Sequence, residues 1–426
     1  MIQFDTWTND HPNTMNVKWY RDTTLLEDQT YTVDSANYFC DTQVQAFNKV
    51  VITIRNMTKA NRFLKIFNIA DGITRQFYNE ELENVEIIEQ ITNNNQALNI
   101  NEAQLTILPQ TNTGVLFQRT LPFSIYRGET LYGKFFINSS TSNTDKTLYK
   151  LKVSDYMNLL EGQTYLGGLY NSTSASTLIA DILGNIPYTL DAGLGAKTIT
   201  GYLPMLNKRE ALRQVAFCLN ALVNTSLGSG EIVIEPMPTT ISATIGKDKI
   251  VNIQTTQTNI TTKIVVDTTI LTTKNADTDN IFSETLNGTT SIIFDSPMFD
   301  LAITGGTILS SNINYAIIQG TGGVVTLTGK EYQEATKSSS KDNPYTVTTD
   351  IEKTENYSTT LVCDGEDILD SLNFIEYKIK STFKMGTVKV GDLISLNGQT
   401  CRVMQLDYDL TQTNIYCNAE LEAYYE

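Results

Sequence analysis

The sequence has few of the residues on which many enzymes depend. Among its 426 residues are one histidine and two tryptophans. The histidine, His11, lies in the polar segment TNDHPN, where a solvated surface histidine is expected. A single histidine excludes zinc sites built from several histidines. Any Ser–His–Asp or Cys–His arrangement would have to use His11, so the sequence predicts no histidine-based catalysis.

Cysteine is also scarce, and its spacing carries no chemistry. The five cysteines include no CxxC pair and no Cys/His pair at zinc spacing. An odd number of scattered cysteines indicates free buried thiols of a protein made in a reducing cytosol. Two of them lie on neighbouring predicted strands and could face each other, but no disulfide is predicted. The cysteines are Cys40, Cys218, Cys363, Cys401 and Cys417.

Positive charge and long apolar runs are missing as well. The chain has 31 Lys and Arg against 47 Asp and Glu, a net charge of −16 and a pI of about 4.6. Proteins that grip nucleic acid need a positive field to displace counterions from phosphate. The nearest basic cluster, Lys208–Arg209 with Arg213, is surrounded by apolar helix positions. We therefore expect no specific nucleic-acid binding.

The first residues, MIQFDTWTND, do not resemble a signal peptide. No apolar run approaches the ~18–20 residues of a membrane helix. We expect synthesis in the cytoplasm of the producing cell and no membrane insertion.

Carboxylates are plentiful, but none is placed as a catalytic pair would be. A glycosidase needs two carboxylates about 5–9.5 Å apart, usually in a cleft lined by aromatic residues. We interpret both acidic clusters as solvated faces, and the second also as first-turn charge of a short helix. The clusters are Glu80, Glu81, Glu83, Glu86 and Glu89, then Asp364, Glu366, Asp367 and Asp370.

Two further segments resemble binding motifs without matching them. Gly322–Lys330 has the wrong spacing for a phosphate-binding loop, and Glu331 replaces the hydroxyl that would bind Mg²⁺. It is interpreted as a strand leaving a Gly-Gly turn. Asp277 and Asp279 lack the rest of a calcium loop. The sequence thus predicts no catalytic, cofactor-binding or metal-ligating residue, and no enzyme.

What the sequence does contain is the pattern of a mainly β protein. Hydrophobic residues make up 41% and charged residues 18%, which suits two to four packed units with a neutral polar surface. Residues 1–165 read as short antiparallel strands. Among them are Lys49–Arg55, Val85–Thr92 with a bulge near Ile87–Ile88, Leu98–Leu108, and a hairpin around Arg127–Gly128.

Residues 166–236 read as an α/β insert. A helix is predicted over Ser176–Leu183, stopped by Gly184. A second helix is predicted over Asn207–Val223, with Asn207 as its cap and Glu210 reaching back to the cap amide. A strand over Glu231–Glu235 follows.

The remaining residues return to strands. Residues 237–333 form a second β-rich region, and residues 334–426 form a loop plus a C-terminal β-unit that completes it. Glu334–Asn343 is predicted to be a long loop, and a short helix is expected over Gly365–Leu372. Phe374–Glu426 should contain four or five strands, with a type I′ hairpin at Asn397–Gly398. No residue-level repeat relates the two β-rich regions.

Several stretches in order resemble one family. The most specific is TGYLPMLNKREALRQVAFCLNALV, Thr200–Val223. It is similar to a "GYLP…REAL" helix of baseplate hub proteins, also called tail-tip hub proteins, from phages and tailocins of Gram-positive hosts. In Tyr149–Tyr170, Asp155, Gly167 and Gly168 stand at recurring positions. Further matches are Asn84–Leu108, Leu121–Ile137, Ile232–Pro236, Thr326–Tyr332 and Lys389–Leu406. None is a catalytic motif.

This resemblance implies two tail-tube-like antiparallel β-barrel domains and a homotrimer. Three copies would present six similar domains and so adapt a sixfold tail tube to a threefold spike. The implied partners are the tail tube protein, the spike and other baseplate proteins, within the tail baseplate of a virion or tailocin. DNA would pass through an acidic lumen without specific binding. The alternatives are a tail-associated cell-wall hydrolase and a tail adhesin for a host-surface glycan.

Overall fold

The computed structural model divides the chain into two compact units, Met1–Gln76 and Phe77–Glu426. The structure describes residues 2–5, 10–34, 36–38, 40, 42, 44, 46–59, 63–69, 77–92, 96–109, 122–145, 147–225, 230–256, 261–273, 277–344, 353–364 and 368–424.

The first unit is built on a three-stranded antiparallel sheet in the order β3-β2-β5. Its central strand buries every second side chain, Met15, Val17 and Trp19, which is the period of a strand with one covered face. The predicted strand at Lys49–Arg55 is confirmed as part of β5. The strands are β1 (Ile2–Gln3), β2 (Pro12–Arg21), β3 (Thr24–Thr32), β4 (Asn37–Tyr38), β5 (Lys49–Met57) and β6 (Asn68–Ile69).

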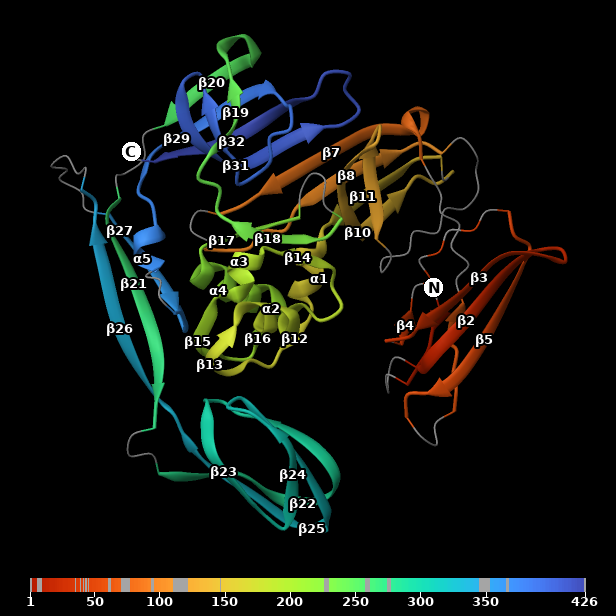
Figure 1. Cartoon of the computed structure of the whole chain (residues 1–426), viewed down its shortest axis with the longest axis vertical. Helices are drawn as coiled ribbons and strands as arrows, with labels where there is room; N and C mark the ends of the chain where they lie inside the picture. Colours follow the sequence, from red (N-terminus) through yellow and green to blue (C-terminus); the bar gives the residue numbers. More distant parts are fainter. Residues whose placement is uncertain are drawn as a thin grey trace. The chain divides into compact units, whose positions relative to one another are not determined.

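The second unit contains an eleven-stranded sheet, which we call the central sheet (Figure 1). Its main path runs β20-β29-β32-β31-β7-β8-β11-β10-β9, and β30 joins β19 to β31. The mainly β class of the prediction is confirmed. The strands are β7 (Leu82–Gln90), β8 (Glu102–Ile107), β9 (Phe123–Arg127), β10 (Thr130–Ser142), β11 (Tyr149–Ser154), β19 (Ile241–Ile245), β20 (Ile250–Thr256), β29 (Ile375–Lys384), β30 (Leu393–Leu396), β31 (Gln399–Asp409) and β32 (Tyr416–Tyr424).

Turn chemistry sets two hairpins of this sheet. Gly128, with φ +59°, begins the two-residue turn between β9 and β10, one residue beyond the predicted position. Asn397 and Gly398 both have positive φ, +49° and +88°, and join β30 to β31. This is the geometry of a type I′ turn, and that prediction is confirmed.

The α/β module, residues 155–236, has its own core of side chains from helices and short strands. The helices are α1 (Tyr156–Glu161), α2 (Ala175–Leu183), α3 (Ala192–Ala196) and α4 (Lys208–Leu219). The strands are β12 (Thr164–Tyr165), β13 (Gly168–Ser174), β14 (Tyr188–Leu190), β15 (Thr198–Leu203), β16 (Leu206–Asn207), β17 (Ala221–Asn224) and β18 (Ile232–Pro236), and β28 (Leu361–Cys363) pairs with β15. The predicted first helix and strand are confirmed.

The second predicted helix is right at its start and wrong at its end. The Asn207 side chain accepts from the Glu210 N–H at 2.8 Å, as a cap does. The Glu210 carboxylate does not reach back to the cap, because Arg213 binds it instead. The helix stops at Leu219, since Asn220 adopts a left-handed conformation, φ +49°. Residues 221–224 then form β17, because a short apolar run fits a buried strand as well as a helix.

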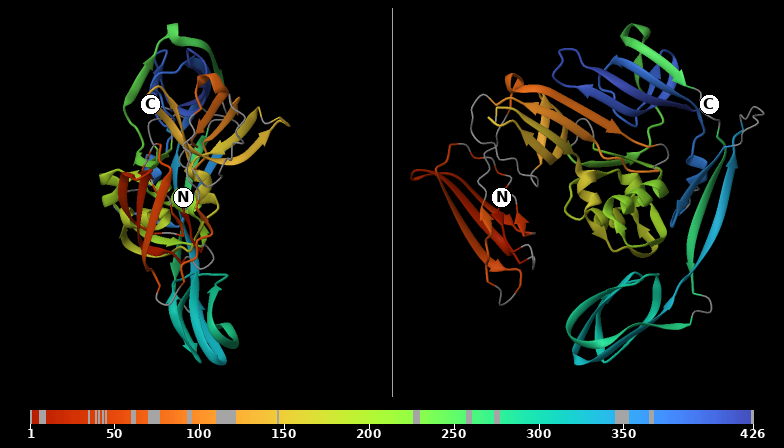
Figure 2. Two further views of the ribbon diagram at one scale, coloured as in Figure 1. Left: turned by 90° about the vertical axis from the view of Figure 1, so that its right-hand side faces the viewer. Right: turned by 180° about the vertical axis from the view of Figure 1, so that it is seen from behind.

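A long hairpin and a distal sheet are inserted between β20 and β29. Figure 2 shows the long antiparallel pair of β21 (Thr261–Thr272) and β26 (Gln333–Asp342), whose ends the distal sheet connects. β27 (Lys353–Thr359) runs parallel to β21. The predicted loop at Glu334–Asn343 is therefore wrong: its polar residues form the β26 ladder. The distal sheet contains β22 (Thr278–Ile293), β23 (Met298–Thr304), β24 (Gly306–Ser311) and β25 (Tyr315–Glu331).

The predicted Gly-Gly turn at Gly322–Gly323 is also wrong, because both glycines lie inside the continuous strand β25. Short helical segments complete the second unit: η1 (Asn79–Glu81), η3 (Lys247–Lys249) and α5 (Ile368–Ser371). The last lies within the predicted helix at Gly365–Leu372, whose residues 365–367 are outside the described part of the chain.

Candidate assembly surfaces

Two groups of five strands in the central sheet have the same topology. Repeat 1 consists of β7, β8, β9, β10 and β11. Repeat 2 consists of β20, β29, β30, β31 and β32. In both, the order across the sheet is third, fourth, fifth, second and first strand, and each pairing is antiparallel.

The two repeats also share two of their register shifts. The first and second strands shift register between Leu82 and Asn84 in repeat 1, and between Ile250 and Asn252 in repeat 2. The fourth and fifth strands shift between Ile137 and Ser139 in repeat 1, and between Val403 and Gln405 in repeat 2. Extra residues of this kind bend a strand at a defined position, so the matched shifts establish residue-by-residue equivalence between the repeats.

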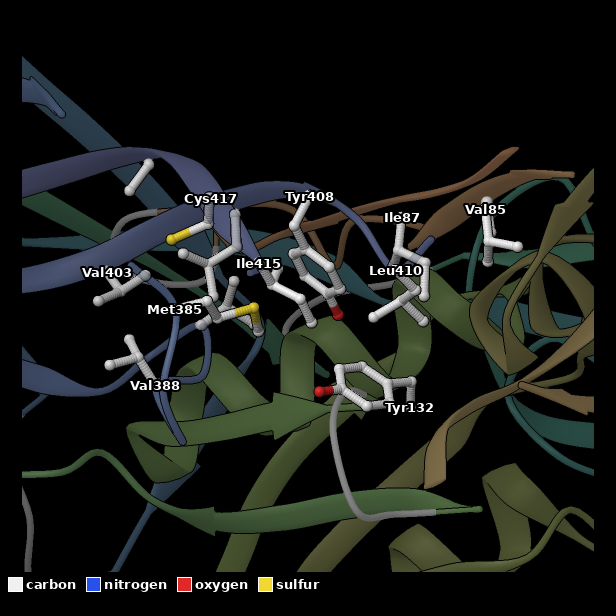
Figure 3. Close-up of a cluster of buried hydrophobic side chains, with 14 of the residues drawn as sticks. Val85, Ile87, Tyr132, Met385, Val388, Val403, Tyr408, Leu410, Ile415 and Cys417 are labelled. Carbon is white, nitrogen blue, oxygen red and sulfur yellow. The ribbon is translucent and has the colours of Figure 1, made fainter. Parts of the chain in front are cut away.

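The repeats meet where β7, the first strand of repeat 1, pairs with β31, the fourth strand of repeat 2. We call this pairing the internal junction. Ile87 lies opposite Tyr408, and Leu410 N donates to Val85 O at 2.9 Å. Figure 3 shows Val85, Ile87, Tyr408 and Leu410 among the apolar side chains of the core that both repeats share. The internal junction is therefore a hydrogen-bonded and apolar seam.

Glu89 lies in this seam, contrary to its prediction as a solvated residue. Its side chain is 1% exposed and follows Val85 and Ile87 on the buried face of β7. Burial and the neighbouring Glu89 carboxylate hold the pKa of the Tyr408 hydroxyl well above its usual value. The predicted bulge at Ile87–Ile88 is wrong for the same reason, because the alternation continues through Glu89. The rest of this acidic cluster is exposed or partly exposed, as predicted.

The same strand positions are open at the other ends of the repeats. Among the described residues, β20 pairs only with β29, and residues 137–142 of β10 pair only with β11, because the β9 pairing stops at Phe135. Ile253 of β20 is 45% exposed, whereas its equivalent at the internal junction, Val85, is 3% exposed. Val251 is 67% exposed. Exposed apolar edge strands without charge or proline invite pairing with another chain.

The face of the sheet opposite the core is polar and carries both charges. Lys380 pairs with Glu420 at 2.6 Å, and Lys378 with Glu422 at 3.3 Å. In repeat 1, the positions equivalent to Glu420 and Asn418 are the exposed Lys152 and Lys150. Acidic residues on this face are thus accompanied by lysines.

A buried carboxylate joins repeat 1 to the α/β module. Asp155 caps α1 by accepting from Met157 N at 3.0 Å. Its other oxygen accepts from Asn101 N at 3.1 Å and from the Thr225 hydroxyl. The side chain is 1% exposed, and burial raises the pKa of Asp155 to about 6. The resemblance singled out Asp155 without giving it a role. In the structure its carboxylate links the start of α1 to the segments that contain Asn101 and Thr225.

The distal sheet is held to the module through one loop. The Asn314 amide donates to Leu166 O at 2.7 Å and to Leu203 O at 2.9 Å. The Asn312 amide donates to Gly167 O at 2.9 Å. A side chain on Gly167 would lie 2.1 Å from Leu203 O, so glycine there permits the close approach of the two segments.

Replacing Asn314 with Ala should loosen this attachment. Asn314 is 6% exposed, and its loss removes a donor from the buried Leu203 O and from the partly buried Leu166 O, at a cost of about 2–3 kcal/mol. We expect faster amide exchange in β24 and in β25 near Asn314, measured by hydrogen–deuterium exchange, with unchanged exchange in β8 and β11. The exposed Ser291→Ala variant is the control. Equal exchange in wild type and Asn314→Ala would contradict a holding role for this contact.

The other residues considered from the sequence do not form a reactive centre in the described part of the chain. His11 is buried rather than solvated, since it is 8% exposed and its Nδ1 lies 3.1 Å from Pro12 O. The Asp364 carboxylate accepts from the Thr198 hydroxyl at 2.7 Å. Glu366 and Asp367 lie outside the described residues. Four of the cysteines are buried and Cys40 is partly exposed.

Asp277 and Asp279 line an acidic hollow of about 640 Å³ with Asp295, Glu331 and Glu334. Within the described ranges, no group of three or more His, Cys, Asp or Glu side chains is arranged to hold a metal ion. The same residues include no helix long and apolar enough to cross a membrane.

No family model matches the chain, and no curated protein matches it in sequence. Its fold is similar to that of the tail protein from Neisseria meningitidis MC58, at 8% identity over 80% of this chain and 92% of that chain, with a TM-score of 0.48. The prophage tail protein gp18 from Listeria monocytogenes EGD-e is 9% identical over 84% and 91%, with a TM-score of 0.46.

The 43 kDa tail protein of prophage MuSo2 from Shewanella oneidensis is 9% identical over 79% of this chain and 93% of that chain, with a TM-score of 0.45. At these identities and TM-scores, the similarities do not by themselves give this chain a role.

Proposed function

We propose that the protein is a non-enzymatic structural component of a contractile phage tail or tail-like bacteriocin, a baseplate hub. It forms a homotrimeric ring that joins the tail tube to the central spike. The observation that carries this proposal is the pair of structurally equivalent repeats in one sheet. One junction is made inside the chain, and the matching edges have no partner strand among the described residues.

The repeats explain how a trimer serves two symmetries. Three chains with two repeats each present six similar surfaces to a sixfold tube, while the chain as a whole keeps threefold symmetry. Repeat 1 belongs to the tube-like domain proposed for residues 1–165. Repeat 2 belongs to the one proposed for residues 237–333 and 334–426. The α/β module and the distal sheet occur once per chain and would follow threefold symmetry outside the ring.

The polar face of the sheet is the proposed wall of the channel. The exposed Lys380–Glu420 pair, with Lys150 and Lys152 on the same face, supports a lumen of mixed charge rather than a uniformly acidic one. A wall that carries charges of both signs offers DNA neither a strong positive field nor strong repulsion. DNA passage without specific binding therefore needs no excess of acid.

The oligomeric state of the full chain tests this proposal. We expect a mass of three chains by light scattering on a size-exclusion column, and particle images with threefold symmetry and six similar lobes around a channel. A zymogram against peptidoglycan should show no clearing. A stable monomer at every concentration, or hydrolysis lost on changing one carboxylate, would contradict the structural role.

A further inference from the structure

We infer that β20 of one copy pairs antiparallel with residues 141–143 of the next copy, which form the end of β10 and the start of the turn after it. The register is that of the internal junction. This inference rests on the proposed ring and adds to it the two strands and their register. The occupant of each open edge is thus a second copy of this chain, not the tube or the spike.

The register comes from the internal junction. There β7 and β31 pair with Ile88 opposite Asp407 and Ile87 opposite Tyr408. The matched shifts make Ile88 equivalent to Thr256 and Ile87 equivalent to Thr255. The same comparison makes Asp407 equivalent to Thr141 and Tyr408 equivalent to Ser142.

Transfer of this register to the open edges places Thr256 of one copy opposite Thr141 of the next. Thr255 then lies opposite Ser142, and Gln254 opposite Asn143. All of these side chains are exposed in the single chain, so each is accessible to the neighbour.

The chemistry of the edges suits this pairing. β20 reads IVNIQTT and the end of β10 reads SSTS, so neither edge carries a charge or a proline. Natural sheets protect a free edge with lysine, proline or a covering segment. β20 instead exposes Val251 and Ile253. A neighbouring strand would cover Ile253 as β31 covers Val85.

Backbone alternation selects the best pair for a cross-link. At the internal junction Leu410 N donates to Val85 O, which makes that pair hydrogen-bonded. Hydrogen-bonded and non-hydrogen-bonded pairs alternate, so Asp407 and Ile88 form a non-hydrogen-bonded pair with Cα atoms about 4.5 Å apart. Such a distance lies within the range of a disulfide.

The test uses Thr141→Cys with Thr256→Cys in the full chain. Mild oxidation should give covalent dimers and trimers on a non-reducing gel, because the two positions meet only between copies. The mismatched variant Thr141→Cys with Thr255→Cys moves one thiol to the opposite face of its strand. We expect about tenfold less covalent product from it. Asp407→Cys with Ile88→Cys, the equivalent pair inside the chain, should form an intramolecular disulfide and serves as the positive control.

The outcomes separate this inference from the proposed function. Covalent linking of the Thr141→Cys/Thr256→Cys variant, with little linking of the mismatched variant, supports both the strand pairing and the proposed ring. If the protein is a trimer but the in-register and mismatched cysteine pairs link equally, or neither links, the strand assignment is wrong. That result would not contradict the proposed ring. A chain that stays monomeric by light scattering, with no covalent product, overturns both. Proteins carrying the native cysteines alone set the background, and four of those five thiols are buried.

Discussion

Aspartate in place of Ile87 should unfold the second unit, whereas aspartate in place of Thr255 should leave the monomer folded and abolish the oligomer. The two residues are equivalent in their repeats. Ile87 is 0% exposed in the shared core, and an unpaired charge buried there costs several kcal/mol, about 4–5 or more. Thr255 is exposed in the single chain, so the same change alters monomer stability by at most about 0.5 kcal/mol.

The measurement combines urea unfolding with light scattering on all variants. Ile87→Asp should be insoluble or unfolded in the absence of urea. Thr255→Asp should unfold at the wild-type midpoint under conditions where both are monomeric, and should show the mass of one chain where wild type shows three. Ile87→Val and Thr255→Ser are the matched controls; each keeps its polarity and should keep the wild-type assembly.

Two results would count against the underlying assignments. If Thr255→Asp assembled as wild type does, β20 would not be part of the contact between copies. If Ile87→Asp folded normally, the internal junction would not be the apolar seam described here. The pair of variants thus tests the equivalence of the repeats through opposite consequences of one substitution.

The strands and the first helix were predictable because their side chains follow the period of the backbone. Val85 and Ile87 alternate on β7, and Asn397–Gly398 has the chemistry of a type I′ turn. The burial of Glu89 was not predicted, because its carboxylate occupies a buried position of β7 where sequence reasoning expects an apolar residue. The polar residues of β26 were predicted to form a loop. They form a strand because its backbone pairs with β21, not because its side chains are buried.

The repeats themselves were not predictable from the residues. Their equivalence lies in strand order and in register shifts, which are properties of backbone pairing. Few equivalent positions carry the same residue, as Asn84 and Asn252 do. Ile87 is packed against the fourth strand of the other repeat, while Thr255 is exposed in the single chain. Because the two positions have different surroundings, they carry different residues. The candidate surfaces therefore emerged only when the pairing was known, although the resemblance of the sequence had already suggested a duplicated fold.

Asp155 should make the chain less stable as pH rises, which is the reverse of the usual effect of a carboxylate. Its pKa in the folded chain is about 6, raised from 3.8 by burial. The folded state therefore binds the proton more tightly than the unfolded state does. Its contribution to the free energy of unfolding is full below about pH 4 and is lost as pH rises through 6, by roughly 2–3 kcal/mol.

Urea unfolding of wild type and Asp155→Asn between pH 4 and pH 8 measures this contribution as a difference, because all other groups are shared. The difference should change by roughly 2–3 kcal/mol across the range, and parallel curves would contradict it. Asp155→Ala removes the acceptor of Met157 N, Asn101 N and the Thr225 hydroxyl. It should cost about 2–4 kcal/mol near pH 5. At pH 7 its cost should be smaller, because the substitution also removes a buried charge. The asparagine variant keeps one acceptor oxygen. Near pH 5 its free energy of unfolding should therefore lie between those of wild type and the alanine variant.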